Sequence, residues 1–177
     1  MTIDRDLETI ALQERRLQFK NFDSGLAWTL GSSIKATAEK INAAVAIDIQ
    51  LHGHPLFFFA MPGTTPNNID WIRRKRNVVL RFHRSSYAIG LTYEHDQTTL
   101  QAKTGADLRD FATHGGGFPI LLEGTGCIGS ITVSGLPQRE DHMLIVSVLQ
   151  EYFHISPEEL ALDIVPHPDR KSSSQKH

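Results

Sequence analysis

The chain has 177 residues, of which 40% are hydrophobic and 21% charged, with 18 Lys and Arg against 20 Asp and Glu. This length predicts one globular domain with a sizeable core. The formal net charge of −2 argues against a strongly basic nucleic-acid binder, and the single cysteine, Cys127, excludes an internal disulfide framework and a cysteine-rich zinc site. No apolar run approaches the roughly 20 residues that span a bilayer, and the charged N-terminus does not resemble a secretory signal peptide. We therefore expect a cytoplasmic protein with neither a membrane nor a nucleic-acid partner.

The first half of the chain predicts two helices, a hairpin and a third helix. Apolar residues recur at loosely helical spacing over 7–19, and Asp23 is placed to cap a second helix that runs to about residue 41. The runs AVAIDIQL and PLFFFAM indicate two strands joined by a turn at 52–55. A loop rich in proline and glycine then leads to a predicted helix over 68–84.

The second half predicts four further strands and two helices, with a capped turn near the end. We expect strands at 85–93 and 98–103, a short helix at 106–114, a hairpin of strands at 118–124 and 127–135, and a helix at 138–153. Ser156 to Glu159 matches a capping box. Because hairpins outnumber crossovers, the pattern favours a single α+β domain over 1–165 with a mainly antiparallel sheet, rather than a doubly wound fold. Residues 166–177 have the polar composition of a tail.

The helix predicted at 68–84 carries a lysine, Lys75, near the middle of its apolar face, which includes Trp71 and Val78. A buried lysine must be paired, or desolvation removes its proton. Two interpretations remain open: the amine reaches a carboxylate within the chain, or it points at an anionic ligand. The opposite face, with Arg74 at its border, is either solvated or a subunit contact, and its arginines are Arg73, Arg76, Arg81 and Arg84.

The nine histidines show no paired metal-ligand spacing, so we predict no metal site. His114 is the exception of interest, because Gly115, Gly116 and Gly117 follow it. Three glycines allow positive φ and close backbone approach. Their amides can form an anion-binding nest beside His114 as an acid, base or axial ligand. The alternative is a flexible helix end that leads into a strand.

Asp141 and His142 fall in the first turn of the helix predicted at 138–153. The helix dipole favours a carboxylate there and disfavours an imidazolium. Asp141 is therefore predicted either to cap the helix or to hold Lys75 or a ligand. His142 shares a face with Ile145 and Leu149, so a core histidine is the favoured interpretation, with a catalytic role as the alternative.

Four blocks of the sequence, AVAIDI, PGTTPNNIDWIRRKRNVVLRF, HGGGFPI and GSITVSGLPQREDH, resemble the GlcG/HbpS-type proteins, in the branch labelled heme-degrading-domain proteins. The blocks lie within about 44–149. The resemblance implies a profilin-like domain with a five-stranded antiparallel sheet flanked by helices, which assembles into homo-oligomers. It also implies heme as a cofactor, with His114 and His142 as candidate ligands, and it favours a position of Lys75 near a pocket.

We therefore expect an oligomeric protein that binds heme or a small carboxylated molecule between the helix at 68–84 and the strand at 127–135. The predicted ligand-binding residues are Trp71, Arg74, Lys75, Gly115, Gly116, Thr132 and Ser134. One alternative is a cofactor-independent acid/base enzyme acting on a small carboxylated or enolisable substrate, with catalytic residues His114, Lys75, Asp141 and His142. The other is an oligomeric protein-interaction module that recruits a partner through its arginine face.

Overall fold

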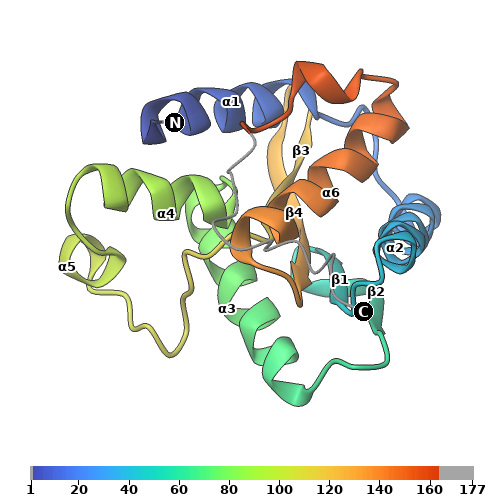
Figure 1. The fold of residues 1–177 in the computed structure, drawn as a ribbon, viewed down its shortest axis with the longest axis horizontal. Coiled ribbons are helices and arrows are strands. Elements are labelled where there is room, and N and C mark those ends of the chain that lie inside the picture. Colours follow the sequence, from blue (N-terminus) through green and yellow to red (C-terminus); the bar gives the residue numbers. More distant parts are fainter. Residues whose placement is uncertain (1, 164–177) are drawn as a thin grey trace, which may run out of the picture.

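A computed structural model describes residues 2–163, so the tail predicted at 166–177 lies outside the described residues. Within that range no helix is long and apolar enough to cross a membrane. The elements, shown in Figure 1, are α1 (Ile3–Arg16), α2 (Ser24–Lys40), β1 (Ala46–Leu51), β2 (His54–Ala60), α3 (Pro66–Phe82), α4 (Ser86–His95), α5 (Leu100–Thr104), β3 (Gly117–Leu122), β4 (Gly126–Ser134), α6 (Gln138–Phe153) and a 3-10 turn (Pro157–Glu159).

The sheet is antiparallel throughout, in the strand order β2-β1-β4-β3. This confirms the α+β prediction, but the expectation of five strands is wrong, because the described residues form four. Beside the outer edge of β3 a single residue, Phe19, forms an isolated parallel bridge with Leu122. Its amide donates to the Leu121 carbonyl at 2.8 Å, and its carbonyl accepts from the Glu123 amide at 2.9 Å. One bridging residue therefore covers an edge where a further strand would pair.

The strand predicted at 85–93 is wrong, since this segment forms α4. The Ser85 side chain accepts a hydrogen bond from the Ala88 amide at 3.2 Å, which caps the helix. Tyr87, Ala88 and Leu91 are buried together against α1, at the three- and four-residue spacing of a helix face. The apolar residues followed the helical period, and the capping serine preceded them.

The elements predicted on either side of residue 105 are also wrong. The segment at 98–103 contains α5 instead of a strand, because Thr99 caps it by accepting from the Ala102 amide at 3.1 Å. No helix forms over 106–114. Instead, the Asp107 side chain accepts from the Arg109 amide at 2.9 Å and closes a turn.

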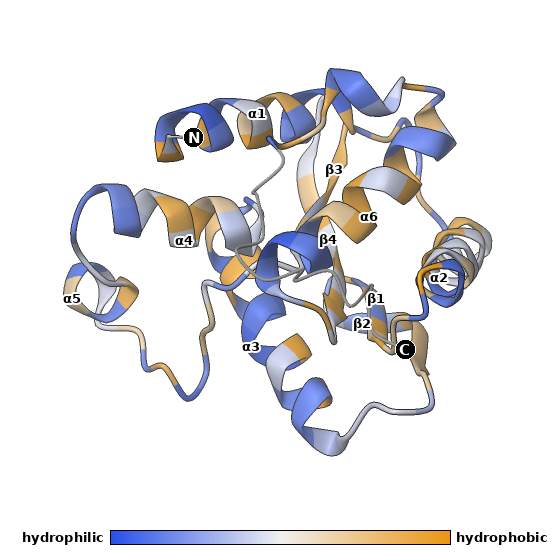
Figure 2. Ribbon diagram, viewed as in Figure 1, coloured by the Kyte–Doolittle hydropathy of each residue, from blue (hydrophilic) through white to orange (hydrophobic). Residues whose placement is uncertain are grey.

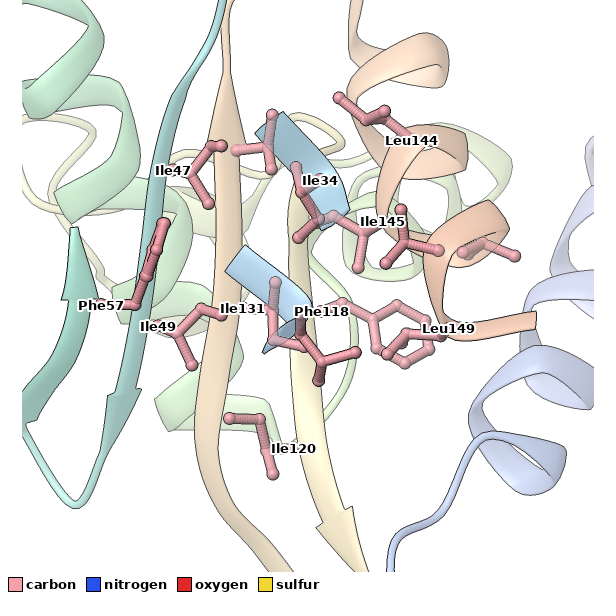
Figure 3. Packing of buried hydrophobic residues seen from close by; sticks show 14 of the residues in the cluster. Ile34, Ile47, Ile49, Phe57, Phe118, Ile120, Ile131, Leu144, Ile145 and Leu149 are labelled. Atoms are coloured by element: carbon pink, nitrogen blue, oxygen red, sulfur yellow. The ribbon is translucent and has the colours of Figure 1, made fainter. Parts of the chain in front are cut away.

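One face of the sheet packs against α2 and α6 and forms the main core. Figure 3 shows Ile47, Ile49 and Ile131 of the strands pointing toward Ile34 of α2 and Ile145 of α6. The N-terminus of α2 begins as predicted, because the Asp23 carboxylate accepts from the Leu26 amide at 2.8 Å. This apolar layer holds the sheet in place and leaves its other face to α3.

The second face of the sheet, which α3 covers, is polar. Alternate residues of β1 and β4 point away from the core, and five of them are polar and buried: Asp48, Gln50, Ser130, Thr132 and Ser134. Figure 2 shows hydrophobic colours along β3, β4 and the middle of α6, whereas hydrophilic colours predominate in the first turns of α3. Five buried polar side chains therefore lie between α3 and the sheet.

Candidate functional site

A cavity of about 230 Å³ opens where the first turns of α3 and α6 meet the end of β4. Both helix N-termini face it, which brings the positive ends of two helix dipoles to one place. The lining residues are Asn67, Asn68, Trp71 and Lys75 of α3, Gln138 and Asp141 of α6, and His114, Ser134, Gly135 and Leu136. The pocket adjoins the helix and the strand between which the sequence predicted a ligand site, and α6 forms its third side.

A buried ion pair forms the floor of the pocket. The Nζ of Lys75 lies 2.8 Å from Oδ2 of Asp141 and donates to the Val133 carbonyl at 3.0 Å. The Asp141 carboxylate also accepts from the Gly135 and Leu136 amides. The two side chains belong to residues only 3% and 1% exposed. Lys75 is therefore compatible with both interpretations: its amine is paired within the chain, and the residue also lines a pocket.

Burial acts on both pKa values of this pair, and the partners oppose it. Desolvation lowers the pKa of the Lys75 ammonium, while the nearby Asp141 carboxylate raises it. Desolvation likewise raises the pKa of the Asp141 carboxyl, against the effect of Lys75 and the two backbone amides. Because three donors surround the carboxylate, we assign a charged pair at neutral pH.

The glycines after His114 let the chain pass close to this ion pair. Gly116 has a φ of +117°, and a Cβ there would lie 2.5 Å from the Val133 carbonyl oxygen and 2.7 Å from Nζ of Lys75. The neighbouring amides are already engaged: Gly115 donates to Oε1 of Gln138 at 3.3 Å, and Gly117 donates to Oγ of Ser86 at 2.9 Å. The glycines therefore serve close packing, and two of the three amides of the predicted anion nest have protein acceptors.

His114 lies at the exposed rim of the pocket, with its ring 4.9 Å from the ring of Trp71 in an edge-on arrangement. Neither ring nitrogen has a hydrogen-bond partner among residues 2–163. Desolvation, then the positive charges of Lys75 and Arg74, lower the pKa of His114. The guanidinium of Arg74 stacks 4.1 Å from the Trp71 ring and donates to Asp70 at 2.8 Å. Arg74 thus supports Trp71 from outside the pocket lining.

The remaining predicted site residues divide between the pocket and the interior. Ser134 lines the cavity, and its Oγ accepts from Asn68 at 3.5 Å. Thr132 is fully buried between the sheet and α3, and its hydroxyl has no partner in the part of the chain that the structure describes. The structure therefore brings Trp71, Lys75, His114, Ser134 and Asp141 together in the lining, and it leaves Arg74, Gly115, Gly116, Thr132 and His142 outside it.

His142 lies in the core, between the rings of Tyr87 and Phe118. Its Nε2 is 2.7 Å from Oε1 of Gln13, whose amide nitrogen donates to the Leu160 carbonyl. This assigns the tautomer with the proton on Nε2. Burial, aided by the charge of Arg139, lowers the pKa of His142 to about 3. This environment matches the core-histidine interpretation.

Five pocket residues were not among the predicted site residues: Asn67, Asn68, Gly135, Leu136 and Gln138. Asn68 completes a capping box, since its Oδ1 accepts from the Thr65 amide at 2.9 Å. The signal was present in TTPNN, where threonine and proline precede a helix whose first turn carries polar side chains. Two predicted helix N-termini flanking one strand would have indicated these positions.

The arginines of α3, and Arg84 just beyond its end, are engaged within the chain. Arg73 pairs with Asp70 and Asp110, and Arg76 pairs with the buried Asp48 at 2.9 Å. Arg81 bonds the Thr104 carbonyl and Arg84 bonds Glu14. No group of three or more His, Cys, Asp or Glu side chains suited to a metal ion occurs among residues 2–163.

Comparison with known proteins shows what the chain is similar to. A family model described as "Haem degrading protein HbpS-like" matches residues 22–150. A UPF0303 protein of Azotobacter vinelandii is 60% identical over 163 residues, 92% of this chain and 98% of the relative. The crystal structure of Ybr137w protein has a TM-score of 0.78 at 33% identity, covering 84% of this chain and 87% of that one. The structure of a PduOC:Heme complex has a TM-score of 0.58 at 16% identity, covering 68% and 86%, and shows likeness of fold alone. These matches confirm the GlcG/HbpS-type resemblance.

Proposed function

We propose, from the premise that this chain belongs to the HbpS-like family, that its pocket between α3 and α6 binds a small molecule through a carboxylate or a similar anionic group. The observation that carries the proposal is the ammonium of Lys75. It has three N–H donors, and the structure gives acceptors to two of them, on Asp141 and Val133. No third acceptor lies within residues 2–163, and Lys75 lines the cavity.

The surroundings of Lys75 favour an anion there. The N-terminal turns of α3 and α6 both line the pocket, and helix N-termini stabilise negative charge. Desolvation, and then the positive charges of Lys75 and Arg74, lower the pKa of His114, so its ring at the rim of the pocket is neutral at pH 7. A neutral His114 ring and the Trp71 indole can then donate hydrogen bonds to a second polar group of the ligand.

Heme fits the chemistry of this pocket but not its size. His114 offers an unprotonated ring nitrogen at the rim, and Lys75 offers a cation for a propionate. However, the cavity of about 230 Å³ is below the range of roughly 300–1,000 Å³ typical for drug-sized ligands, and a porphyrin is larger than those. The pocket of one subunit therefore does not enclose heme, and a small carboxylate is the better fit. Heme is nevertheless the first ligand to test, because the structurally similar PduOC protein was crystallised in complex with heme.

The decisive experiment is native mass spectrometry of protein purified without added ligand, followed by a heme titration read by absorbance. We expect a small retained mass, and a heme titration that does not saturate with one site per chain. A saturable Soret shift at micromolar heme that disappears in His114→Ala would overturn the preference for a small carboxylate. Saturation without dependence on His114 would place heme elsewhere on the protein.

An acid/base enzyme is the second candidate, favoured by the same rim histidine. His114 is neutral near pH 7, has no intramolecular partner within the described chain, and faces a pocket with a charged floor. A group in that position can accept a proton from a bound substrate. If the pocket is catalytic, turnover of the retained small molecule falls at acid pH as His114 protonates, and His114→Gln abolishes it. Unchanged turnover in this variant would exclude the role.

A further inference from the structure

A second cavity, of about 560 Å³, lies on the other side of α3, against β1 and β2. Its α3 residues include Ile69, Arg73 and Arg76, which follow one another at three- and four-residue spacing. The first pocket uses Trp71 and Lys75 instead, so the two cavities share no lining residue. At this volume the second cavity falls within the usual range of ligand sites.

The floor of the second cavity is a buried polar cluster on β1. Asp48 is 3% exposed and accepts hydrogen bonds from Nε2 of Gln50 at 3.0 Å and from Nη1 of Arg76 at 2.9 Å. A guanidinium has five N–H donors, and Arg76 has this one acceptor among the described residues. The amide oxygen of Gln50 likewise receives no hydrogen bond within residues 2–163. An arginine with unused donors and a glutamine with an unused acceptor therefore bind the same carboxylate, that of Asp48.

The charges around this cavity cancel. Asp48 pairs with Arg76, and Asp70 pairs with Arg73 at 3.0 Å. A charged ligand would lose its hydration without gaining a net opposite charge. The first pocket differs, because Lys75 keeps an unused donor there and the N-terminal turns of α3 and α6 add positive partial charge.

The walls of the second cavity are apolar and open at one side. Phe58 and Ile69 are 48% and 45% exposed, and Pro55, Pro66 and Ile72 complete the wall. Large apolar side chains that are left in contact with water beside a polar floor are typical of ligand sites. A flat apolar body fits this wall, because an aromatic ring such as Phe58 packs against planar groups.

We propose that this cavity is a second ligand site, which takes an uncharged planar molecule whose adjacent hydrogen-bond acceptor and donor meet Arg76 and Gln50. Aromatic primary amides have this chemistry: the carbonyl accepts from the guanidinium, the amide nitrogen donates to Oε1 of Gln50, and the ring lies against Phe58. The site does not depend on the function proposed for the first pocket, because no lining residue is common to both.

The test uses benzamide and benzoate, which share a ring and differ in charge. Backbone amide shifts of the ¹⁵N-labelled full-length protein are followed by NMR as each probe is added. Benzamide is expected to shift the amides of β1, β2 and the Ile69 turn of α3, with a saturable dependence. Benzoate is expected to bind there at least about tenfold more weakly, and its shifts near His114 and Lys75 report the first pocket separately.

Phe58→Ala and Phe59→Ala form a matched pair of variants on β2. Both side chains are exposed, at 48% and 37%, but Phe59 lies outside the cavity, under the ammonium of Lys35. Phe58→Ala is expected to weaken benzamide binding about three- to tenfold, and Phe59→Ala is expected to leave it within twofold. The proposal is wrong if benzoate shifts the β1–β2 amides as strongly as benzamide does, if neither probe shifts them, or if both variants behave alike.

Discussion

The charges of Lys75 and Asp141 depend on each other, because both side chains are almost completely buried and lie 2.8 Å apart. Breaking a buried ion pair by removing one partner leaves the other charge without compensation. This loss of stability is distinct from any loss of ligand binding, although replacing Lys75 would cause both. A test of binding therefore needs a variant in which both charges are removed together.

We predict that Lys75→Met and Asp141→Asn each lower the free energy of unfolding by about 3 to 5 kcal/mol. The double variant should lose less than the sum of the two, since neither charge is left unpaired. The Asn side chain keeps an oxygen for the Leu136 amide, which donates to Asp141 at 2.9 Å. Urea denaturation of the four proteins measures the coupling. Additive losses would mean that the two charged side chains contribute to stability independently, with no coupling energy between them.

His142 makes the stability of the fold depend on pH. Its pKa is about 3 in the folded protein against 6.5 for the free side chain. Between these values the unfolded chain binds a proton that the folded chain does not. The contribution of His142 to the free energy of unfolding is therefore constant above pH 6.5. It makes the free energy of unfolding decrease as the pH falls toward 3, by at most about 1.4 kcal/mol per pH unit.

We expect His142→Gln to flatten this dependence between pH 6 and pH 4 in urea denaturation. Its amide can donate to Gln13 in place of Nε2, so the variant retains the hydrogen bond to α1. His114→Gln is the matched control, because His114 lies at the exposed rim of the pocket and should contribute less. An unchanged pH slope in His142→Gln would show that other groups dominate acid unfolding.

At the scale of single residues, the sequence indicated the site through charged side chains at positions where the hydrophobic pattern or the helix start made them unusual. Lys75 interrupted an apolar face, and Asp141 stood in a first helical turn, so both were predicted near the pocket that they line. Thr132 and Arg74 were placed on the right elements, but their side chains lie outside the lining. Which side of a helix or strand faces a cavity is set by packing between elements, which periodicity alone does not determine.

At the scale of elements, segments with a strong cap or strict alternation were predictable. The helix α6 runs over 138–153 as expected, and β3 and β4 form the expected hairpin. The secondary structure predicted for 85–114 was wrong because hydrogen bonds from capping side chains determine the structure there. Thr99 starts a helix of five residues, and Asp107 closes a turn. Elements this short span too few residues for hydrophobic periodicity to predict them.

The glycine turn before β3 is the element on which the pocket floor depends. Gly116→Ala is expected to destabilise the protein by at least about 3 kcal/mol, because φ is +117° and the new Cβ meets Val133 and Lys75. Gly124→Ala is the control: φ is +72° there, but nothing lies within 4 Å of the Cβ, so the cost should be about 1 kcal/mol. Thermal unfolding compares the two. Equal losses would show that the turn tolerates a side chain next to Lys75.

At the scale of the whole molecule, the assembly remains a prediction. The family resemblance implies a homo-oligomer, and we expect native mass spectrometry to give a multiple of the 19.8 kDa chain mass. The arginines of α3 are paired within the chain, so charge reversal at Arg73 should destabilise the fold rather than only weaken an assembly. A single mass of one chain at micromolar concentration would contradict the expected oligomer.

The most direct test of the proposed function follows the fluorescence of Trp71, which lines the pocket, in a Trp28→Phe background, since Trp28 is 68% exposed and lies on α2. Benzoate is titrated into this protein and into the same protein carrying Lys75→Met and Asp141→Asn. The fluorescence change is expected to saturate in the first protein, and the dissociation constant of benzoate is expected to be at least about tenfold higher in the second, because a hydrogen bond to a charged group contributes roughly 1.5–3 kcal/mol. Equal affinity in the two proteins would contradict an anion site built on Lys75.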